Sequence, residues 1–219
     1  MDQTRRAYRR ESQEVRRSAL ITATQDLVAE GGPQAATVRA IAARAGVTAG
    51  LIRHYFRSKD DLLRVAYIEL MEGMTAAGSD ALEGVGAQPD ERLAAFVAAS
   101  LRPPVIDGGA VGLWAGYMHK VRSDLELLGV HEVAYLQYRD ALEALIAALP
   151  RNANAAQLRA EAIACNGLID GLWLEGSILP HAFAPDELAT IGLRSVGAIL
   201  GVDLMPYANQ LPDSGKTPK

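Results

Sequence analysis

The sequence predicts an all-α protein. Apolar residues recur at helical spacing along most of the chain, and no segment keeps the two-residue alternation of a strand. Alanine is frequent and aromatic residues make up only 5% of the chain, which favours helices. Glycine and proline clusters separate segments that each have the length of a helix.

Nine helices are predicted in chain order. The first ends at Gly31-Gly32-Pro33, the fourth begins at Ser58 with Asp61 as a variant of the capping box, and prolines end or open several of the others. The buried stripe expected of the first helix comprises Val15, Ala19, Leu20, Ala23, Leu27 and Val28. The predicted ranges are 10–31, 37–45, 48–54, 58–83, 89–101, 110–123, 124–149, 154–179 and 185–200.

The length of 219 residues and the 49% hydrophobic content allow one large domain or two small ones. We expect four segments: a disordered basic arm over 1–9, two helical domains over 10–57 and 58–202, and a flexible tail over 203–219. No apolar run reaches 18 residues, and the charged N-terminus lacks the apolar core of a signal peptide. These features predict a soluble cytoplasmic protein with no membrane partner.

The single cysteine, Cys165, excludes a disulfide framework and a cysteine-rich metal site. Its place in an apolar helix is typical of a small buried hydrophobic residue. The four histidines are scattered without the spacing of metal ligands, and no phosphate-binding loop or hydrolase motif is present. We therefore expect no metal, no cofactor and no enzymatic activity.

The segment 37–59 is the most informative part of the chain, because it has the pattern of a helix-turn-helix. Thr37 is suited to begin one short helix, and Gly46 follows its last apolar residue, where left-handed glycines often end helices. Thr48 is suited to begin a second helix. In such a motif the first residues of the second helix face base edges in the major groove.

Three pieces of this region resemble the TetR family of bacterial transcriptional regulators: LITATQDLVAEGG (20–32), TVRAIAARAGVTAG (37–50) and HYFRSKDDLL (54–63). The resemblance implies that 10–57 is a three-helix DNA-binding domain, the head. It also implies that 58–202 is a helical ligand-binding and dimerisation domain, the body, which holds a small-molecule inducer. NGLIDGLWLEGSIL (166–179) and GLIRHYF (50–56) are similar to the BetI-type repressors, which respond to choline. Arg53 departs from the aromatic residue that many members have before His54, so their base preference is not carried over.

Position assigns the expected DNA contacts. Thr48 and nearby backbone N–H groups can meet a phosphate at the helix N-terminus, and Ala49 and Gly50 are small enough to let the helix approach the groove floor. Arg53 is the candidate for a guanine contact; a phosphate contact or a solvated side chain is the alternative. The full predicted set is Thr37, Arg39, Thr48, Ala49, Gly50, Arg53, His54, Tyr55 and Lys59. The roles of the last three follow from the family resemblance, and Tyr55 is alternatively a core residue.

Charge is distributed unevenly along the chain. Residues 1–65 contain 12 Lys and Arg against 7 Asp and Glu, whereas the remainder contains 10 against 19. A basic head on an acidic body favours binding of double-stranded DNA through one end, since phosphate affinity depends on local positive charge. The arginines at 5, 6, 9 and 10 form either an arm that contacts DNA or a solubilising tail.

Two groups of body residues are candidates for other partners. An inducer pocket is predicted from apolar, aromatic and buried polar residues, although core packing explains each of them as well. Its members are Trp114, Tyr117, Met118, Asn166, Asp170 and Trp173. A homodimer interface is predicted from a close-approach glycine pair and an apolar stripe on the last helix. Its members are Gly167, Gly171, Leu188, Ile191, Ser195 and Ile199.

The function predicted is a ligand-responsive DNA-binding regulator, most simply a repressor that a small molecule releases from its operator. The sequence leaves two other classes open: a helical adaptor that binds protein, and an all-helical enzyme. The basic head against the acidic body favours the regulator, because an adaptor would not need local positive charge.

Overall fold

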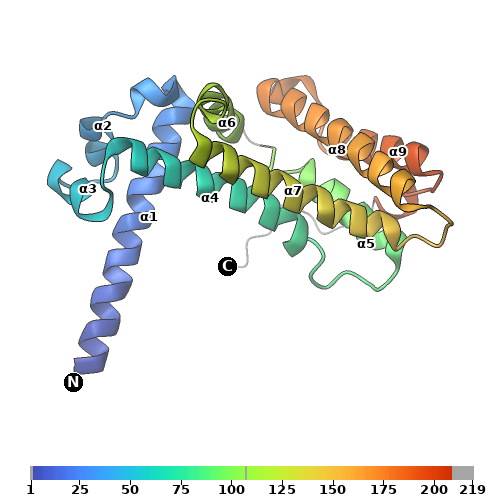
Figure 1. Cartoon of the computed structure of the whole chain (residues 1–219), viewed down its shortest axis with the longest axis horizontal. Coiled ribbons are helices and arrows are strands. Elements are labelled where there is room, and N and C mark those ends of the chain that lie inside the picture. Colours follow the sequence, from blue (N-terminus) through green and yellow to red (C-terminus); the bar gives the residue numbers. More distant parts are fainter. Residues whose placement is uncertain (1, 107, 209–219) are drawn as a thin grey trace. The chain divides into compact units, whose positions relative to one another are not determined.

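The computed structural model describes residues 2–106 and 108–208 and confirms the all-helical class, with nine α-helices and no strand among those residues. The helices are α1 (Asp2–Ala35), α2 (Val38–Arg44), α3 (Ala49–Tyr55), α4 (Lys59–Asp80), α5 (Pro89–Ser100), α6 (Gly108–Val121), α7 (Leu125–Ala147), α8 (Ala155–Ile178) and α9 (Glu187–Leu200) (Figure 1). Two short 3₁₀ turns, Pro180–Ala182 and Met205–Tyr207, lie before and after α9.

The chain divides into two compact units. The head unit contains the described residues up to Leu70 together with 111–128, and the body unit contains the rest. The sequence predicted a boundary at 57/58, but the first part of α4 and most of α6 belong to the head unit. The reason is packing, because α6 lies close to α1: a Cβ added at Gly116 would stand 3.1 Å from Pro33 Cδ.

The head is built around the second half of α1. Its core consists of Leu20, Ile21, Ala23, Val28, Ile41, Ile52, Phe56, Leu62, Leu63, Ala66 and Tyr67, all less than 5% exposed. Val15 was expected in this stripe but is 64% exposed. The helix continues N-terminal to the part that packs, so a stripe residue there has nothing to cover it.

Residues 2–9 were expected as a disordered arm, and the structure places them in α1. Three of these eight residues are arginine, which has high helix propensity, and the helix extends ahead of its packed part. At the other end the predicted stop is confirmed: Gly31 and Gly32 leave helical geometry, and Gly32 takes a φ of 73° before one further turn.

The body is held together by close helix contacts around α8 and α9, which lie side by side (Figure 1). Added Cβ atoms at Gly176 and Gly192 would stand 2.3 Å from side-chain atoms of Leu188 and Leu101. These glycines therefore let the helices approach one another. The tail expected from residue 203 begins later, since Leu204 is 1% exposed and the turn 205–207 packs against α5 and α9. The remainder of that tail, 209–219, lies outside the described residues.

Candidate DNA-binding site

The turn between α2 and α3 forms as the sequence predicted. Thr37 caps α2, its Oγ1 accepting a hydrogen bond of 3.1 Å from the N–H of Ala40. Gly46 takes a φ of 65°, and the N–H of Val47 donates to the carbonyl of Ala42 across the turn. Thr48 precedes α3, but its side chain makes no capping hydrogen bond. Its hydroxyl is exposed, as a contact to a ligand outside the chain would require.

The two faces of α3 differ sharply. Ile52 is 2% exposed and packs in the head core, and Phe56 closes the end of the helix at 4%. On the other face Ala49, Gly50, Arg53 and His54 are all exposed. A Cβ added at Gly50 would meet no neighbouring element within 4 Å, so none of the described residues covers the helix at this position. The face combines small residues with a free-standing basic group, as a helix entering a groove requires.

The side chains at the edges of α3 are less open. Tyr55 is half-buried, with its ring centroid 5.1 Å from that of His54 and 6.5 Å from that of Phe56. Arg39 in α2 is exposed, and Lys59, the first residue of α4, is half-buried. Tyr55, Arg39 and Lys59 lie next to the exposed face of α3 in the chain, and their contacts with DNA stay a prediction.

The end of the site is fixed by a cap at the start of α4. The N–H of Asp61 donates to Ser58 Oγ at 3.0 Å, and the N–H of Arg57 donates to Asp61 Oδ2 at the same distance. This reciprocal pair is the capping-box variant that the sequence predicted. These hydrogen bonds fix the start of α4, and with it the position of Lys59 relative to the end of α3.

Arg44 is not available for DNA in this structure. Its guanidinium donates to both carboxylate oxygens of Glu30, at 2.9 and 2.7 Å. The hydrogen bonds from Arg44 hold the pKa of the Glu30 carboxyl below its usual value. The positive charge of the head that remains for phosphates therefore excludes Arg44.

Comparison with known proteins identifies the head and the body separately. Residues 20–66 match the family described as "Bacterial regulatory proteins, tetR family", and residues 89–201 match "BetI-type transcriptional repressor, C-terminal". The chain belongs to the TetR family. It is a DNA-binding transcriptional regulator with a BetI-type repressor body, and the family consists of regulators rather than enzymes.

Relatives of this TetR-family chain match it over most of its length. The HTH-type transcriptional regulator BetI of Burkholderia ambifaria is 31% identical over 166 residues, which are 75% of this chain and 84% of that regulator. A putative transcriptional regulator from Pseudomonas aeruginosa has a similar structure, with 29% identity, a TM-score of 0.75 and coverage of 89% and 94% of the two chains. A putative regulator from Saccharomonospora viridis in complex with choline shares the fold at 18% identity, a TM-score of 0.69 and coverage of 84% and 95%.

The six residues of the predicted inducer pocket fall in different units. Trp114, Tyr117 and Met118 belong to the head unit, and the three α8 residues belong to the body unit, so their meeting in one pocket stays a prediction. Tyr117 is 1% exposed, its hydroxyl donates to the carbonyl of Leu63, and its ring lies against Tyr67. Burial raises the pKa of both tyrosines far above the usual value.

Within the body unit, Asn166 and Asp170 of α8 form a hydrogen-bonded cluster with Tyr135 of α7. The sequence predicted the two α8 residues but not the tyrosine. Asn166, 1% exposed, donates from Nδ2 to Tyr135 Oη at 3.1 Å and to Asp170 Oδ2 at 2.8 Å. Tyr135 in α7 was not predicted, because its partner is fixed by helix packing and not by spacing along the chain. Trp173 is buried, and its Nε1 donates to the carbonyl of Val105 at 2.8 Å, which fixes the indole in the core.

The predicted dimer residues separate into two kinds. Gly167, Gly171, Ile191 and Ile199 are exposed and Ser195 is half-buried, whereas Leu188 is 6% exposed against α8. Leu188 therefore packs within the chain and has little surface left to offer a partner. Ile178 at 57% and Leu174 at 37% are exposed on α8 and were not predicted.

Two further properties concern only the part of the chain that the structure describes. No helix there is long and apolar enough to cross a membrane. No group of three or more His, Cys, Asp or Glu side chains among those residues is arranged to hold a metal ion.

Proposed function

We propose that the chain acts in the cytoplasm as a homodimeric repressor, which binds a two-fold operator through α3 of each copy and leaves it when a small cation binds the body. The observation that carries the DNA part is the uncovered face of α3, with Gly50 and Arg53 exposed. Two recognition helices related by a two-fold axis would read half-sites about one helical turn of DNA apart or a multiple of it.

Dimerisation is supported by apolar side chains that one copy leaves exposed. Ile163, Leu174 and Ile178 lie on one face of α8 with Gly167 and Gly171, and α9 adds Ile191 and Ile199. The spacing of the α8 residues places them along a single stripe of that helix. Small and apolar residues in such a stripe suit a closely packed contact with the same stripe of a second copy.

Ligand binding is supported by polar atoms in α8 that lack partners. Asn166 Oδ1 and Ser177 Oγ are buried and have no hydrogen-bond partner among the described residues. Buried polar atoms are nearly always paired, so the unpaired Asn166 Oδ1 invites a ligand or a second protein copy. Ser177 lies about three turns further along α8 and is a separate position. The Asp170 carboxylate and the Tyr135 ring next to Asn166 offer a counter-charge and an aromatic face, both suited to an organic cation.

The distant relative in complex with choline makes choline the first cation to test. A ligand bound in the body releases DNA only if it prefers a state in which the two recognition helices no longer match the operator. By linkage, the operator must weaken ligand binding by the same factor.

The test begins by selecting operator DNA from a random pool with the purified protein. Choline is then titrated while operator affinity and the fluorescence of Trp114 and Trp173 are recorded. We expect both signals to change at matching concentrations, and Asp170→Asn to abolish the change without altering operator affinity. Stearoyl-CoA, bound by a FadR regulator of similar fold, is the comparison ligand. A response to the acyl-CoA and not to choline would reject the cation proposal and keep ligand control.

A further inference from the structure

The helix α6 is fastened to the DNA-binding head at several places within the head unit. Added Cβ atoms at Gly112 and Gly116 would stand 3.0 Å from the Ala29 carbonyl oxygen and 3.1 Å from Pro33 Cδ. Near its other end, α6 contacts α4 through the hydrogen bond from Tyr117 to the Leu63 carbonyl. Because the backbone of α6 lies this close to α1, α6 cannot shift unless the rest of the head moves with it or repacks.

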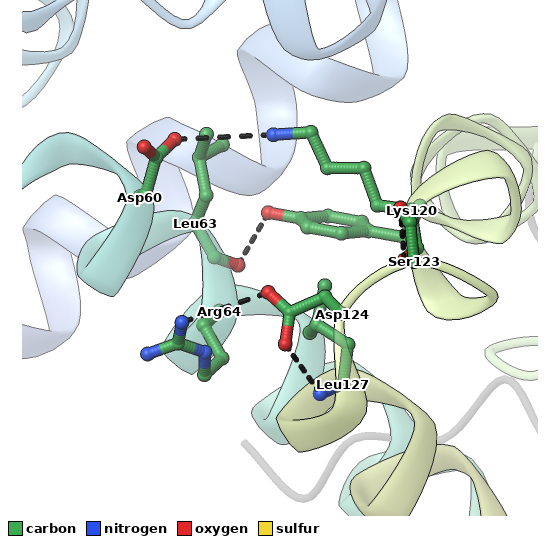
Figure 2. A pocket seen from close by; sticks show the side chains of 8 residues that line it. Asp60, Leu63, Arg64, Lys120, Ser123, Asp124 and Leu127 are labelled. Atoms are coloured by element: carbon green, nitrogen blue, oxygen red, sulfur yellow. Dashed lines mark hydrogen bonds and ion pairs between the residues drawn. The ribbon is translucent and has the colours of Figure 1, made fainter.

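A charged cavity of about 320 Å³ lies beside these contacts. Figure 2 shows that its walls come from the start of α4 and from the end of α6 with the turn into α7. The lining residues are Asp60, Leu63, Arg64, Tyr117, Lys120, Ser123, Asp124 and Leu127.

Two ion pairs span the cavity. Lys120 Nζ stands 3.8 Å from Asp60 Oδ1, and Arg64 Nη2 stands 3.6 Å from Asp124 Oδ2 (Figure 2). Arg64 also has Glu126 at 3.2 Å and Asp61 at 3.9 Å. The guanidinium is thus the centre of three carboxylates, and its side chain is only 23% exposed. The Asp60 side chain is 73% exposed, so solvent weakens its pair with Lys120, and the less exposed Arg64 makes the stronger of the two links.

Asp124 has a second role, which connects these pairs to α7. Its Oδ1 accepts hydrogen bonds from the N–H groups of Glu126 and Leu127, at 3.0 and 3.2 Å, and so caps that helix. These hydrogen bonds, with a smaller contribution from Arg64, hold the pKa of the Asp124 carboxyl below its usual value. One carboxylate therefore caps α7 and pairs with α4.

We propose that Arg64 and Lys120 are positioning residues for operator recognition. Through Asp124 and Asp60 they hold the first turn of α4 against the α6–α7 turn, and that first turn begins at Lys59, four residues after α3 ends. The pairs thereby set the placement of α3 relative to α6 in each copy. The proposal rests on α3 being the recognition helix.

Charge alone predicts the opposite of this proposal, which makes it testable. Removing a carboxylate from the head lowers the repulsion of phosphates, so simple electrostatics predicts tighter binding to every DNA sequence. Loss of positioning instead predicts weaker binding to the operator and no loss on random DNA. Asp124→Asn separates the two, because asparagine is as good a helix cap as aspartate but carries no charge.

The experiment measures affinities of the full-length protein for the selected operator and for a random duplex of equal length. Asp124→Asn and Asp60→Asn are expected to lower operator affinity by about threefold to tenfold and to leave random-duplex affinity unchanged or raised. The matched control is Asp26→Asn in α1, which removes the longer contact of 3.8 Å from Asp26 to Arg44 and leaves the Arg44–Glu30 hydrogen bonds in place. It should not weaken operator binding.

Rescue distinguishes positioning from a loss of stability. Asp60→Lys should weaken operator binding, and adding Lys120→Asp should restore it, since the reversed pair faces the same cavity. Thermal unfolding of each variant is recorded alongside.

The proposal is overturned if the two asparagine variants tighten both DNAs as Asp26→Asn does, or if the reversed pair restores nothing while all variants stay folded. If α3 is not the recognition helix, Arg53→Ala leaves both operator affinity and base preference unchanged, and that result identifies failure of the underlying assumption.

Discussion

The exposed face of α3 and the exposed face of α8 are both helical surfaces that the chain leaves uncovered, yet they differ in chemistry. On α3 the exposed residues are Ala49, Gly50, Arg53 and His54, small or basic. On α8 they include Ile163, Leu174 and Ile178, which are apolar, beside two glycines. The first suits a charged polymer with a narrow groove and the second suits another apolar protein surface. The residue types on these two exposed faces therefore indicate two different kinds of partner, DNA for α3 and a protein surface for α8.

The largest effect is expected from charging the apolar face. Ile178→Asp would place a carboxylate in a contact that the two-fold axis repeats, so the dimer should dissociate. Operator affinity should fall by about 100-fold or more, because two linked recognition helices bind far more tightly than one. Sedimentation and operator titration provide the measurements.

Val133→Asp is the matched control for that variant, since Val133 is 55% exposed on α7 outside the α8–α9 stripe. It should remain dimeric and bind the operator normally. Leu188→Asp should unfold the body instead, because Leu188 is buried. A dimeric Ile178→Asp protein with normal operator affinity would reject this face as the interface.

The next effect concerns the basic face. Arg53→Ala should weaken operator binding by about 1–3 kcal/mol and relax preference at one base position. Lys59→Ala should weaken binding to all sequences alike and reduce the salt slope by about one unit. Selection from random DNA at several salt concentrations measures both. If base preference is unchanged in Arg53→Ala, its contact is to phosphate, and the difference between the two residues disappears.

A smaller and two-sided effect is expected at Gly50. No atom stands within 4 Å of an added Cβ, so Gly50→Ala should stabilise the free protein by about 0.5–1 kcal/mol through helix propensity. The same methyl group would stand on the groove-facing side of α3 and should lower operator affinity. Chemical denaturation and operator titration are compared on one preparation. Gly46→Ala is the contrast, since a φ of 65° makes alanine there destabilising without added bulk at the groove.

The smallest effect is expected from Asp170, which lies beside the apolar stripe of α8. Desolvation raises the pKa of its carboxyl above the usual value, and the hydrogen bond from Asn166 partly opposes that shift. The folded chain thus holds this proton more tightly than the unfolded chain does. Its contribution to stability is present at low pH and is lost as the pH rises above the usual aspartate pKa.

Denaturation of wild type and Asp170→Asn across that range gives the measurement. The wild type should lose stability relative to the variant as the pH increases. Equal pH profiles of the two proteins would mean that the Asp170 carboxyl is as well solvated in the folded chain as in the unfolded chain.

Local sequence determined the nine helices and the turn of the head. Thr37, Gly46, Ser58 and Asp61 act on backbone groups within four residues of themselves, and each does in the structure what its type and position predict. The buried Ile52 and the exposed Arg53 on α3 follow in the same way from helical spacing. Family membership was likewise carried by contiguous residues of this segment.

Tertiary structure alone decided which helices share a unit and which side chains meet. Val15 belongs to an apolar stripe by spacing but is exposed, because nothing packs on that part of α1. Leu188 belongs to an apolar face but is covered by α8. The pairs Arg64–Asp124 and Asn166–Tyr135 join residues 60 and 31 positions apart. Such contacts depend on the packing of whole helices, and the periodicity of one helix carries no information about which neighbour will cover it.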